Sequence, residues 1–197
     1  LALILDADIV PEKLELLDNI THVSESLNTT IEHLNEVVSI QTNSNQLKVE
    51  VNFANTLEQV TTSINQIIEN NNVTINSDFS KAEIIEYIPA YLDSIFLNLL
   101  TNAIKYKHKD RDPVIDISTS RDFTNYDRVV LKISDNGLGI DMDKFGDKLF
   151  GMYKTFHYNT DARGIGLFIT KNQVESLNGE ISATSDVNLG TTFTIKF

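Results

Sequence analysis

The segment from residue 41 to residue 46, QTNSNQ, contains no apolar side chain, and the hydrophobic pattern of the chain changes across it. Before it, apolar residues recur at helical spacing. After it, alternating runs typical of strands are mixed with helical runs. A polar break of this kind is typical of a domain boundary. The sequence therefore predicts a helical segment over residues 1–46 and a domain of helices and strands over residues 47–197.

Residues 11–41 carry the pattern of one long helix. Pro11 suits the first turn of a helix, and acidic residues follow it where the helix dipole favours them. Apolar residues then recur alternately three and four positions apart, which is the heptad spacing of a coiled coil. This seam consists of Leu17, Ile20, Ser24, Leu27, Ile31, Leu34 and Val38. We expect it to pack against a partner helix in a dimeric bundle; packing on the helix's own domain is the alternative.

The pattern after residue 46 predicts an α+β sandwich of layers. Strand-like runs cover residues 47–53, 72–79, 83–89, 114–120, 128–134, 180–186 and 191–197, and helical runs cover residues 56–71, 91–106 and 166–179. The runs 114–120 and 128–134 are expected to pair, and the last two runs are expected to form a hairpin. Gly179 is the expected cap of the helix before that hairpin.

Composition excludes several functional classes. A formal net charge of −12 argues against the phosphate backbone of a nucleic acid or an anionic membrane surface as a partner. No apolar run approaches the roughly 20 residues that a membrane-spanning helix needs. The chain has no cysteine, which excludes disulfides, a cysteine nucleophile and thiolate metal sites. These features are compatible with a cytoplasmic domain.

Three polar side chains align on one face of the predicted helix 91–106. Asn98, Asn102 and Lys105 are four and three positions apart, and apolar residues occupy the opposite face. An Asn carbonyl oxygen is a hard ligand for Mg²⁺, and a Lys neutralises phosphate charge. The face therefore indicates a Mg²⁺–phosphate site, with an ordinary solvated helix face as the alternative.

Two glycine motifs flank a segment without a clear period. In DNGLGI, Asp135 follows a strand, and the glycines either make a tight turn or let a ligand approach the backbone. In RGIGL, Gly164 and Gly166 precede a helix whose N-terminal N–H groups attract phosphate. The segment between them, DKLFGMYKTFHYNTDA, is rich in aromatic and polar residues. We expect it to form a lid over a ligand.

Taken in order, these motifs resemble the ATP-binding catalytic domain of sensor histidine kinases. The order is NLLTNAIKY, DNGLGI, LFGMYKTFH, RGIGLFITK and GTTFTIKF, and the resemblance covers about residues 11–197. The wider superfamily also includes ATPase domains of type II topoisomerases, MutL and heat-shock chaperones. The NAIKY ending, the segment holding Phe150 and Phe156, and the long preceding helix favour a histidine kinase. The resemblance implies a two-layer α/β sandwich of the Bergerat type, with a mixed sheet and helices on one face, preceded by a helical hairpin or coiled coil for dimerisation.

The resemblance also implies a role for each motif position. Asn102 would coordinate Mg²⁺, Asn98 would assist it or the phosphates, and Lys105 would meet phosphate. Asp135 would accept a hydrogen bond from the adenine amino group of ATP. The other positions implied to line the nucleotide site are Tyr106, Gly137, Gly139, Phe150, Arg163, Gly164, Gly166, Leu167 and Thr191. Of these, Gly137 and Gly139 would give the base room, and Arg163 would contact phosphate.

Two features depart from the family pattern. Ala162 stands where the family commonly has another glycine, from which we expect a changed lid conformation more than lost binding. The phosphoacceptor motif, a His followed by an acid and Arg-x-Pro, is absent around His22, His33, His108 and His157. We expect His22 and His33 to be solvated residues of the long helix. The apolar start LALIL is expected to end a preceding antiparallel helix, with the acceptor His upstream.

The resemblance therefore implies the catalytic part of a two-component sensor histidine kinase, with ATP and Mg²⁺ as cofactors. It would transfer the γ-phosphoryl group to a histidine and then to an aspartate of a response regulator. The implied partners are a second copy through the N-terminal helices and that regulator, with a membrane reached only through segments outside this sequence. One alternative is an ATPase, which would need a general-base Glu one turn before Asn102. Asn98 stands at that position, and the nearest upstream candidates, Glu83 and Glu86, do not. The other is a nucleotide-binding pseudokinase or dimerising scaffold.

Overall fold

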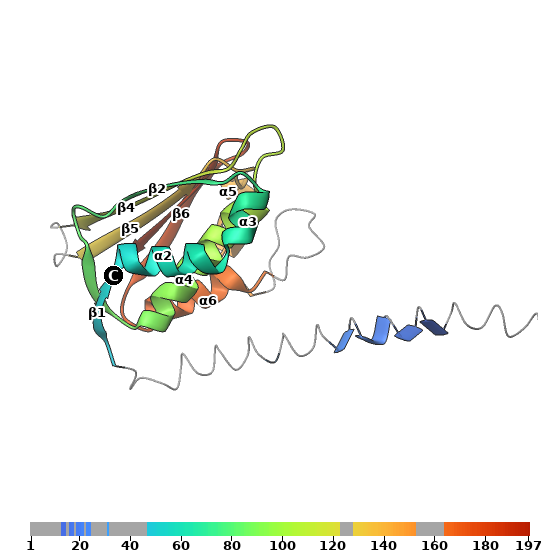
Figure 1. Ribbon diagram of the computed structural model, residues 1–197, viewed down its shortest axis with the longest axis horizontal. Helices are drawn as coiled ribbons and strands as arrows, with labels where there is room; N and C mark the ends of the chain where they lie inside the picture. The colour runs from blue at the N-terminus through green and yellow to red at the C-terminus, as the bar shows by residue number, and fades with distance from the viewer. Residues whose placement is uncertain are drawn as a thin grey trace, which may run out of the picture. The chain divides into compact units, whose positions relative to one another are not determined.

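The structure is a computed structural model of the 197-residue chain. It describes residues 47–122, 128–152 and 164–197, together with residues 13, 14, 16, 17, 19–21, 23, 24 and 31. The chain divides into two compact units, Leu1–Thr42 and Asn43–Phe197, which are treated separately below (Figure 1).

The described residues of the first unit are all helical, as the sequence predicts for residues 11–41. Their apolar side chains are between 53% and 61% exposed: Leu14, Leu16, Leu17, Ile20, Val23 and Ile31. Leu17, Ile20 and Ile31 belong to the predicted seam, so part of that seam is a solvent-facing apolar surface in a single chain. The positions Leu27, Leu34 and Val38 lie outside the described residues, as do His22 and His33.

The second unit contains two β-sheets. A two-stranded sheet pairs β1 (Val49–Asn52) with β3 (Ile84–Tyr87) in antiparallel orientation. A five-stranded mixed sheet has the order β2-β4-β5-β7-β6. Its strands are β2 (Thr74–Asp78), β4 (Val114–Asp122), β5 (Arg128–Asp135), β7 (Gly190–Lys196) and β6 (Glu180–Asp186). The pair β2–β4 is parallel, whereas β4–β5 and β6–β7 are antiparallel, which confirms the two strand pairs expected from the sequence.

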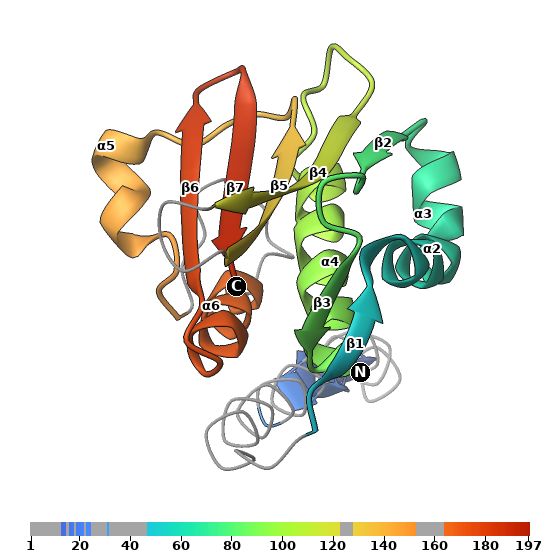
Figure 2. The same cartoon turned by 90° about the vertical axis from the view of Figure 1, so that its left-hand side faces the viewer.

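Helices cover one face of the five-stranded sheet, as Figures 1 and 2 show together. The three longer ones are α2 (Phe53–Ser63), α4 (Pro89–Lys105) and α6 (Gly166–Glu175). Shorter elements are α3 (Asn65–Asn70), α5 (Met142–Phe145) and the 3-10 turn η1 (Gly146–Lys148). In the part of the chain that the structure describes, every helix is too short or too polar to cross a membrane.

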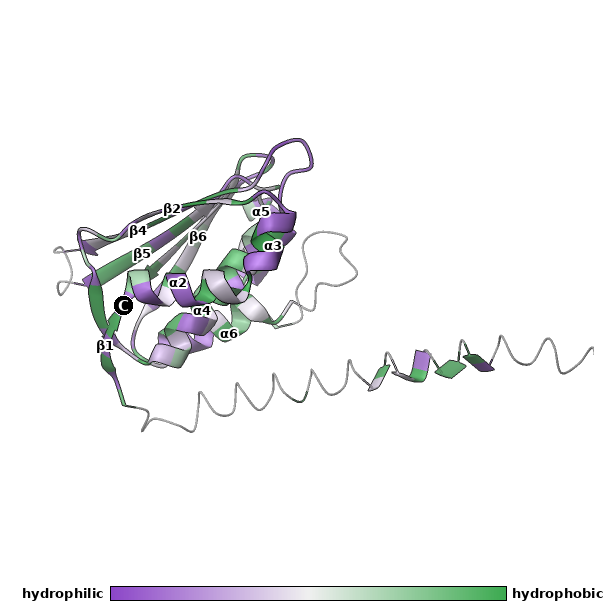
Figure 3. Ribbon diagram, viewed as in Figure 1, coloured by the Kyte–Doolittle hydropathy of each residue, from purple (hydrophilic) through white to green (hydrophobic). Residues whose placement is uncertain are grey.

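Helix α4 supplies the centre of the core. Pro89 stands at its first turn, where a missing N–H costs nothing. Its buried side chains are Tyr91, Leu92, Ile95, Phe96, Leu99, Leu100, Ala103 and Ile104. The fully buried sheet residues Ile115, Leu131 and Ile195 belong to the same core. Figure 3 shows hydrophobic and hydrophilic residues alternating along these elements, as expected where only one side is buried.

The prediction of a single helix over residues 56–71 is wrong in one respect, because the chain forms two helices there, which meet at Ile64. The hydroxyls of Thr61, Thr62 and Ser63 each donate to a carbonyl three or four residues earlier. Such side-chain bonds compete with the helical ladder and bend helices. Three in succession explain a break at this position.

Gly179 is not the cap of α6, which corrects a second prediction. The helix ends at Glu175 with Ser176 as its cap, and the left-handed residue of the following turn is Asn178, with φ of 65°. Gly179 instead permits close packing, because a Cβ there would lie 2.8 Å from both the Lys196 carbonyl oxygen and Val174 Cγ1. The glycine therefore joins the helix to the final hairpin rather than ending the helix.

Shortening a core residue of α4 tests its central role. Leu99 is 1% exposed, so Leu99→Ala is expected to reduce the free energy of unfolding by about 2–5 kcal/mol through lost burial and a cavity. Leu97 lies on the same helix but is 42% exposed, so Leu97→Ala is the matched control and should cost less than about 1 kcal/mol. Chemical denaturation of both variants measures the difference, and equal losses would contradict this assignment of the core.

Candidate functional site

The described members of the predicted site come from five places in the second unit: the C-terminal half of α4, the end of β5 with the loop after it, the segment after η1, the start of α6 and the start of β7. Direct contacts join the end of α4, the loop after β5 and the turn before β7. Leu138 N donates to the Tyr106 carbonyl oxygen at 2.9 Å, and Asn188 N donates to the Leu138 carbonyl oxygen at 2.7 Å. The structure thus gathers motifs that lie up to about 90 residues apart in the sequence.

Asp135 is the last residue of β5 and the centre of this cluster. Its Oδ1 accepts hydrogen bonds from the backbone N–H groups of Gly137, at 2.8 Å, and Thr191, at 3.3 Å. Within the described residues, no hydrogen bond reaches Oδ2. One carboxylate oxygen therefore holds the local backbone, while the other is left to accept a hydrogen bond from a ligand.

Burial of Asp135 raises the pKa of its carboxyl group above the ordinary value. The two backbone hydrogen bonds and the positive charge of Arg111 act in the opposite direction but do not cancel the burial. The ionised carboxylate is consequently held at an energetic cost to the fold. A ligand N–H that reaches Oδ2 would offset part of that cost.

The glycines near Asp135 are required by the chain itself. A Cβ at Gly137 would lie 2.6 Å from the Tyr106 carbonyl oxygen and 2.8 Å from Asp135 Oδ1. Gly139 has a φ of 67°, and a Cβ there would overlap the carbonyl oxygen of Asp186. DNGLGI is therefore a tight turn packed against α4 and the β6–β7 hairpin.

Arg111 is a site residue that sequence reasoning missed. Its Nε donates to the Asn136 carbonyl oxygen at 2.6 Å, and its Nη2 donates to the carbonyl oxygens of Gly137, at 3.0 Å, and Asn188, at 2.6 Å. One guanidinium group thus ties the loop after β5 to the β6–β7 turn. Arg111 lies in the polar run KHKDRDP, outside every motif, so no sequence signal marked it.

Thr191, which the resemblance implies for the nucleotide site, lies beside Asp135. It is buried, and its hydroxyl shares a hydrogen bond of 2.9 Å with Ser185 Oγ. Ser185 in turn donates to the Gly190 carbonyl oxygen at 2.7 Å and accepts from Ile140 N at 2.8 Å. These bonds fix the start of β7 against the glycine turn.

Asn98 and Asn102 lie at the contact between α4 and α6, so their face is not an ordinary solvated one. Asn102 Nδ2 donates to Asn98 Oδ1 at 3.2 Å, and Asn98 Nδ2 donates to the buried Thr170 Oγ1 at 2.7 Å. Lys105 is exposed, with its Nζ 6.0 Å from the ring centroid of Tyr106. Burial raises the pKa of the Tyr106 hydroxyl.

The residues of α4 fit a magnesium ion that also binds phosphate. Asn102 Oδ1 takes part in no hydrogen bond within the described residues, which leaves an amide oxygen for the metal. Among those residues, no group of three or more His, Asp or Glu side chains forms a metal-binding cluster. A Mg²⁺ at Asn102 would therefore take its other ligands from phosphate oxygens and water, which is the usual arrangement for this ion.

The lid and the second glycine motif are described only in part. Phe150 is half-buried, with Lys171 Nζ 6.0 Å from its ring centroid. Gly164 has a φ of 66°, and Gly166 and Leu167 form the first turn of α6. The expectations for Phe156, His157, Ala162 and Arg163 fall on residues 153–163, outside the described residues.

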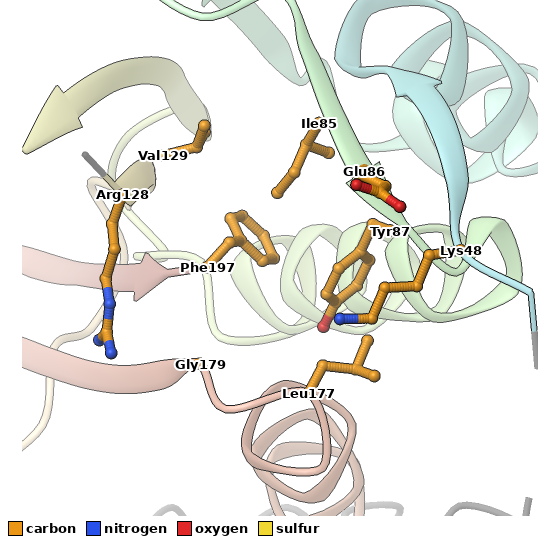
Figure 4. A pocket seen from close by; sticks show the side chains of 9 residues that line it. All are labelled: Lys48, Ile85, Glu86, Tyr87, Arg128, Val129, Leu177, Gly179 and Phe197. Atoms are coloured by element: carbon orange, nitrogen blue, oxygen red, sulfur yellow. The ribbon is translucent and has the colours of Figure 1, made fainter. Parts of the chain in front are cut away.

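A separate pocket of about 240 Å³ lies away from this cluster (Figure 4). Its lining includes Arg128, the first residue of β5, whereas Asp135 is the last residue of the same strand. Seven residues of extended strand separate these two positions by roughly 23 Å. The pocket is therefore not part of the candidate site.

Comparison with known proteins agrees with the motifs. Residues 88–197 match the family described as "Histidine kinase-, DNA gyrase B-, and HSP90-like ATPase". The histidine protein kinase SaeS of Staphylococcus aureus (strain MSSA476) is 25% identical over 185 residues, which cover 92% of this chain and 52% of SaeS. The chain thus spans about half the length of the curated relatives that it matches.

Solved structures show the same fold. The Acinetobacter baumannii histidine kinase AdeS aligns with a TM-score of 0.70 and 21% identity, covering 88% of this chain and 78% of that one. The catalytic domain of histidine kinase ThkA aligns with a TM-score of 0.63 and 20% identity, covering 76% of this chain and 95% of that one. Since the family match covers more than half of the sequence, the chain belongs to the histidine kinase-, DNA gyrase B- and HSP90-like ATPase family.

Proposed function

We propose that this chain is the catalytic part of a two-component sensor histidine kinase. It binds Mg²⁺–ATP and transfers the γ-phosphoryl group to a histidine other than the four in this sequence, from which an aspartate of a response regulator receives it. The observation that carries the proposal is the geometry of Asp135. Its Oδ1 is used by two backbone N–H groups, and its Oδ2 is left for the adenine amino group.

The remaining residues divide between the two ends of the nucleotide. Thr191 and the glycine turn support Asp135 at the adenine end, and Tyr106 lies behind that turn. At the phosphate end, Asn102 offers an oxygen to Mg²⁺ and Lys105 offers a positive charge to the phosphates. The start of α6, from Gly166, presents backbone N–H groups toward anions. A bound Mg²⁺ would supply charge neutralisation on the transferred group, and the residues of the chain would contribute positioning.

The proposed architecture is the Bergerat-type sandwich over residues 47–197, preceded by a dimerising helical segment over residues 1–46. The exposed apolar side chains of the first unit support dimerisation, because a stripe of this kind needs a partner surface. The proposed partners are a second copy of the chain and the receiver domain of a response regulator.

An ATPase that activates water is the second candidate, and the structure disfavours it. Such an enzyme needs a carboxylate one turn before Asn102, but the residue there is Asn98, whose amide groups both bond within the chain. Glu86 lies in β3 and lines the separate pocket of Figure 4. A scaffold without nucleotide affinity is the remaining alternative, and titration with ATP distinguishes it.

Removal of the Asp135 charge is expected to weaken ATP binding. Asp135→Asn keeps an oxygen for the two backbone N–H groups but replaces the acceptor Oδ2 with a donor. Loss of a hydrogen bond to a charged group costs about 1.5–3 kcal/mol, so the dissociation constant should rise roughly 10- to 100-fold. Calorimetric titration with Mg²⁺–ATP measures this change. Asp186→Asn, at an exposed neighbouring position, removes the same charge and should leave affinity unchanged.

The same variant is expected to stabilise the protein without nucleotide at neutral pH. Because burial raises the pKa of Asp135, ionisation destabilises the folded state relative to the unfolded state. That penalty is absent below the ordinary pKa of 3.8 and grows as the pH rises above it. Thermal midpoints of Asp135→Asn should therefore exceed wild type at pH 7, with a difference that shrinks toward pH 4. A lower midpoint for the variant at pH 7 would contradict the assigned burial.

The chain is expected not to phosphorylate itself. None of its four histidines has the acceptor context, so incubation with Mg²⁺–ATP should leave His22 and His33 unmodified. Mass spectrometry at alkaline pH, where phosphohistidine survives, makes the measurement, with an acid-treated sample as the control. Acid-labile phosphate on either residue would overturn the proposed position of the acceptor.

A further inference from the structure

We propose that Thr170 is a positioning residue for the metal-binding end of the site: its hydroxyl orients Asn98, which in turn orients Asn102. The inference deepens the proposed function and rests on it. Thr170 belongs to α6 and is fully buried, and although it lies within the motif RGIGLFITK, no role was assigned to it from the sequence.

The three residues form a chain of hydrogen bonds across two helices. Asn98 Nδ2 donates to Thr170 Oγ1 at 2.7 Å, and Asn98 Oδ1 accepts from Asn102 Nδ2 at 3.2 Å. Both ends of the Asn98 amide are therefore occupied by protein groups. A second N–H and a second lone pair of the amide stay available, but these two bonds fix the plane of the amide, and the role that we assign to Asn98 is to hold Asn102.

The start of α6 selects the orientation of the Asn98 amide. Gly166 is the first residue of this helix, and a Cβ added there would overlap Asn98 Oδ1. The N-terminus of a helix carries partial positive charge, which favours an oxygen beside it over an amide NH₂ group. Thr170 lies four residues later on the same face of α6 and receives the NH₂ group. Because a hydroxyl can donate or accept, the start of α6 sets which end of the amide faces Asn102, and the bond to Thr170 then holds the amide in that orientation.

This orientation decides which atom Asn102 presents to the site. With Asn98 Oδ1 facing it, Asn102 uses its NH₂ group internally and keeps Oδ1 for a cation. With Asn98 turned by half a rotation, the Asn98 NH₂ group would pair with Asn102 Oδ1 and occupy the metal ligand. The Thr170 hydroxyl would therefore affect magnesium binding through the side-chain amides of Asn98 and Asn102, without contacting Asn102, the proposed metal ligand.

The test compares two substitutions at Thr170 in the full chain. Thr170→Val keeps the shape but removes the acceptor for Asn98 Nδ2, whereas Thr170→Ser retains the hydroxyl. ATP affinity is measured with Mg²⁺ and again with a chelator, and the ratio reports the metal contribution. Loss of a group that orients a metal ligand typically costs about tenfold or more in metal affinity, so Thr170→Val should lower this ratio about tenfold. Affinity without metal should stay near wild type, and Thr170→Ser should restore the ratio.

Thr119→Val is the matched control, because Thr119 is also buried and donates to the Ala82 carbonyl oxygen at 2.7 Å, away from the site. It should reduce thermal stability and leave the magnesium ratio unchanged. A Thr170→Val variant that is merely less stable, with the wild-type ratio, would overturn the inference. Wild-type chain without ATP affinity in either condition would instead overturn the proposed function.

Discussion

The end of the site that we propose for adenine depends on one oxygen atom, Oδ1 of Asp135. It accepts the N–H groups of Gly137, from the loop after β5, and Thr191, from β7. These segments are far apart in sequence, and the carboxylate joins them at the same edge of the sheet. Arg111 closes the arrangement from outside by binding three carbonyl oxygens of the same loop and turn. The carboxylate is partly desolvated, and the two N–H groups and Arg111 offset only part of that cost.

Helix α4 links the core to the phosphate end. Eight of its side chains are buried, so its position relative to the sheet is set by hydrophobic packing. Asn98 lies on the face of α4 that contacts α6, and Asn102 is hydrogen-bonded to it. The packing of α4 therefore also fixes the positions of these two side chains. The amide proposed to bind the metal thus lies on the described helix with the most buried side chains rather than on a loop.

Periodicity predicted the elements that are buried on one side. The alternation in β4, the apolar run in β5 and the apolar face of α4 are strong signals, because burial of a regular element dictates its pattern. The break at Ile64 was missed because it arises from three hydroxyl side chains, which leave the apolar spacing unchanged.

The contacts of the site were less accessible to sequence reasoning. The neighbourhood of Asp135 and Thr191 was anticipated only through the family resemblance, since 56 residues separate them. The roles of Arg111, outside every motif, and of Thr170, inside RGIGLFITK, were missed for the same reason. Each is a single residue whose partners, Asn188 and Asn98, lie 77 and 72 residues away. A lone Arg or Thr creates no local pattern, so its role follows only from the tertiary fold.

The two ends of the site are held by different parts of the fold, and this separation has a functional consequence. The adenine end is fixed by the turn after β5 and the β6–β7 hairpin, with contacts that need no ligand. The phosphate end is fixed by the contact between α4 and α6, through the amides of Asn98 and Asn102. Preorganisation of this kind lowers the entropy lost on binding. The bond from Leu138 N to the Tyr106 carbonyl oxygen joins the two ends, so a movement of α4 would reach both, whereas the contact of Asn98 with Thr170 of α6 belongs to the proposed phosphate end alone.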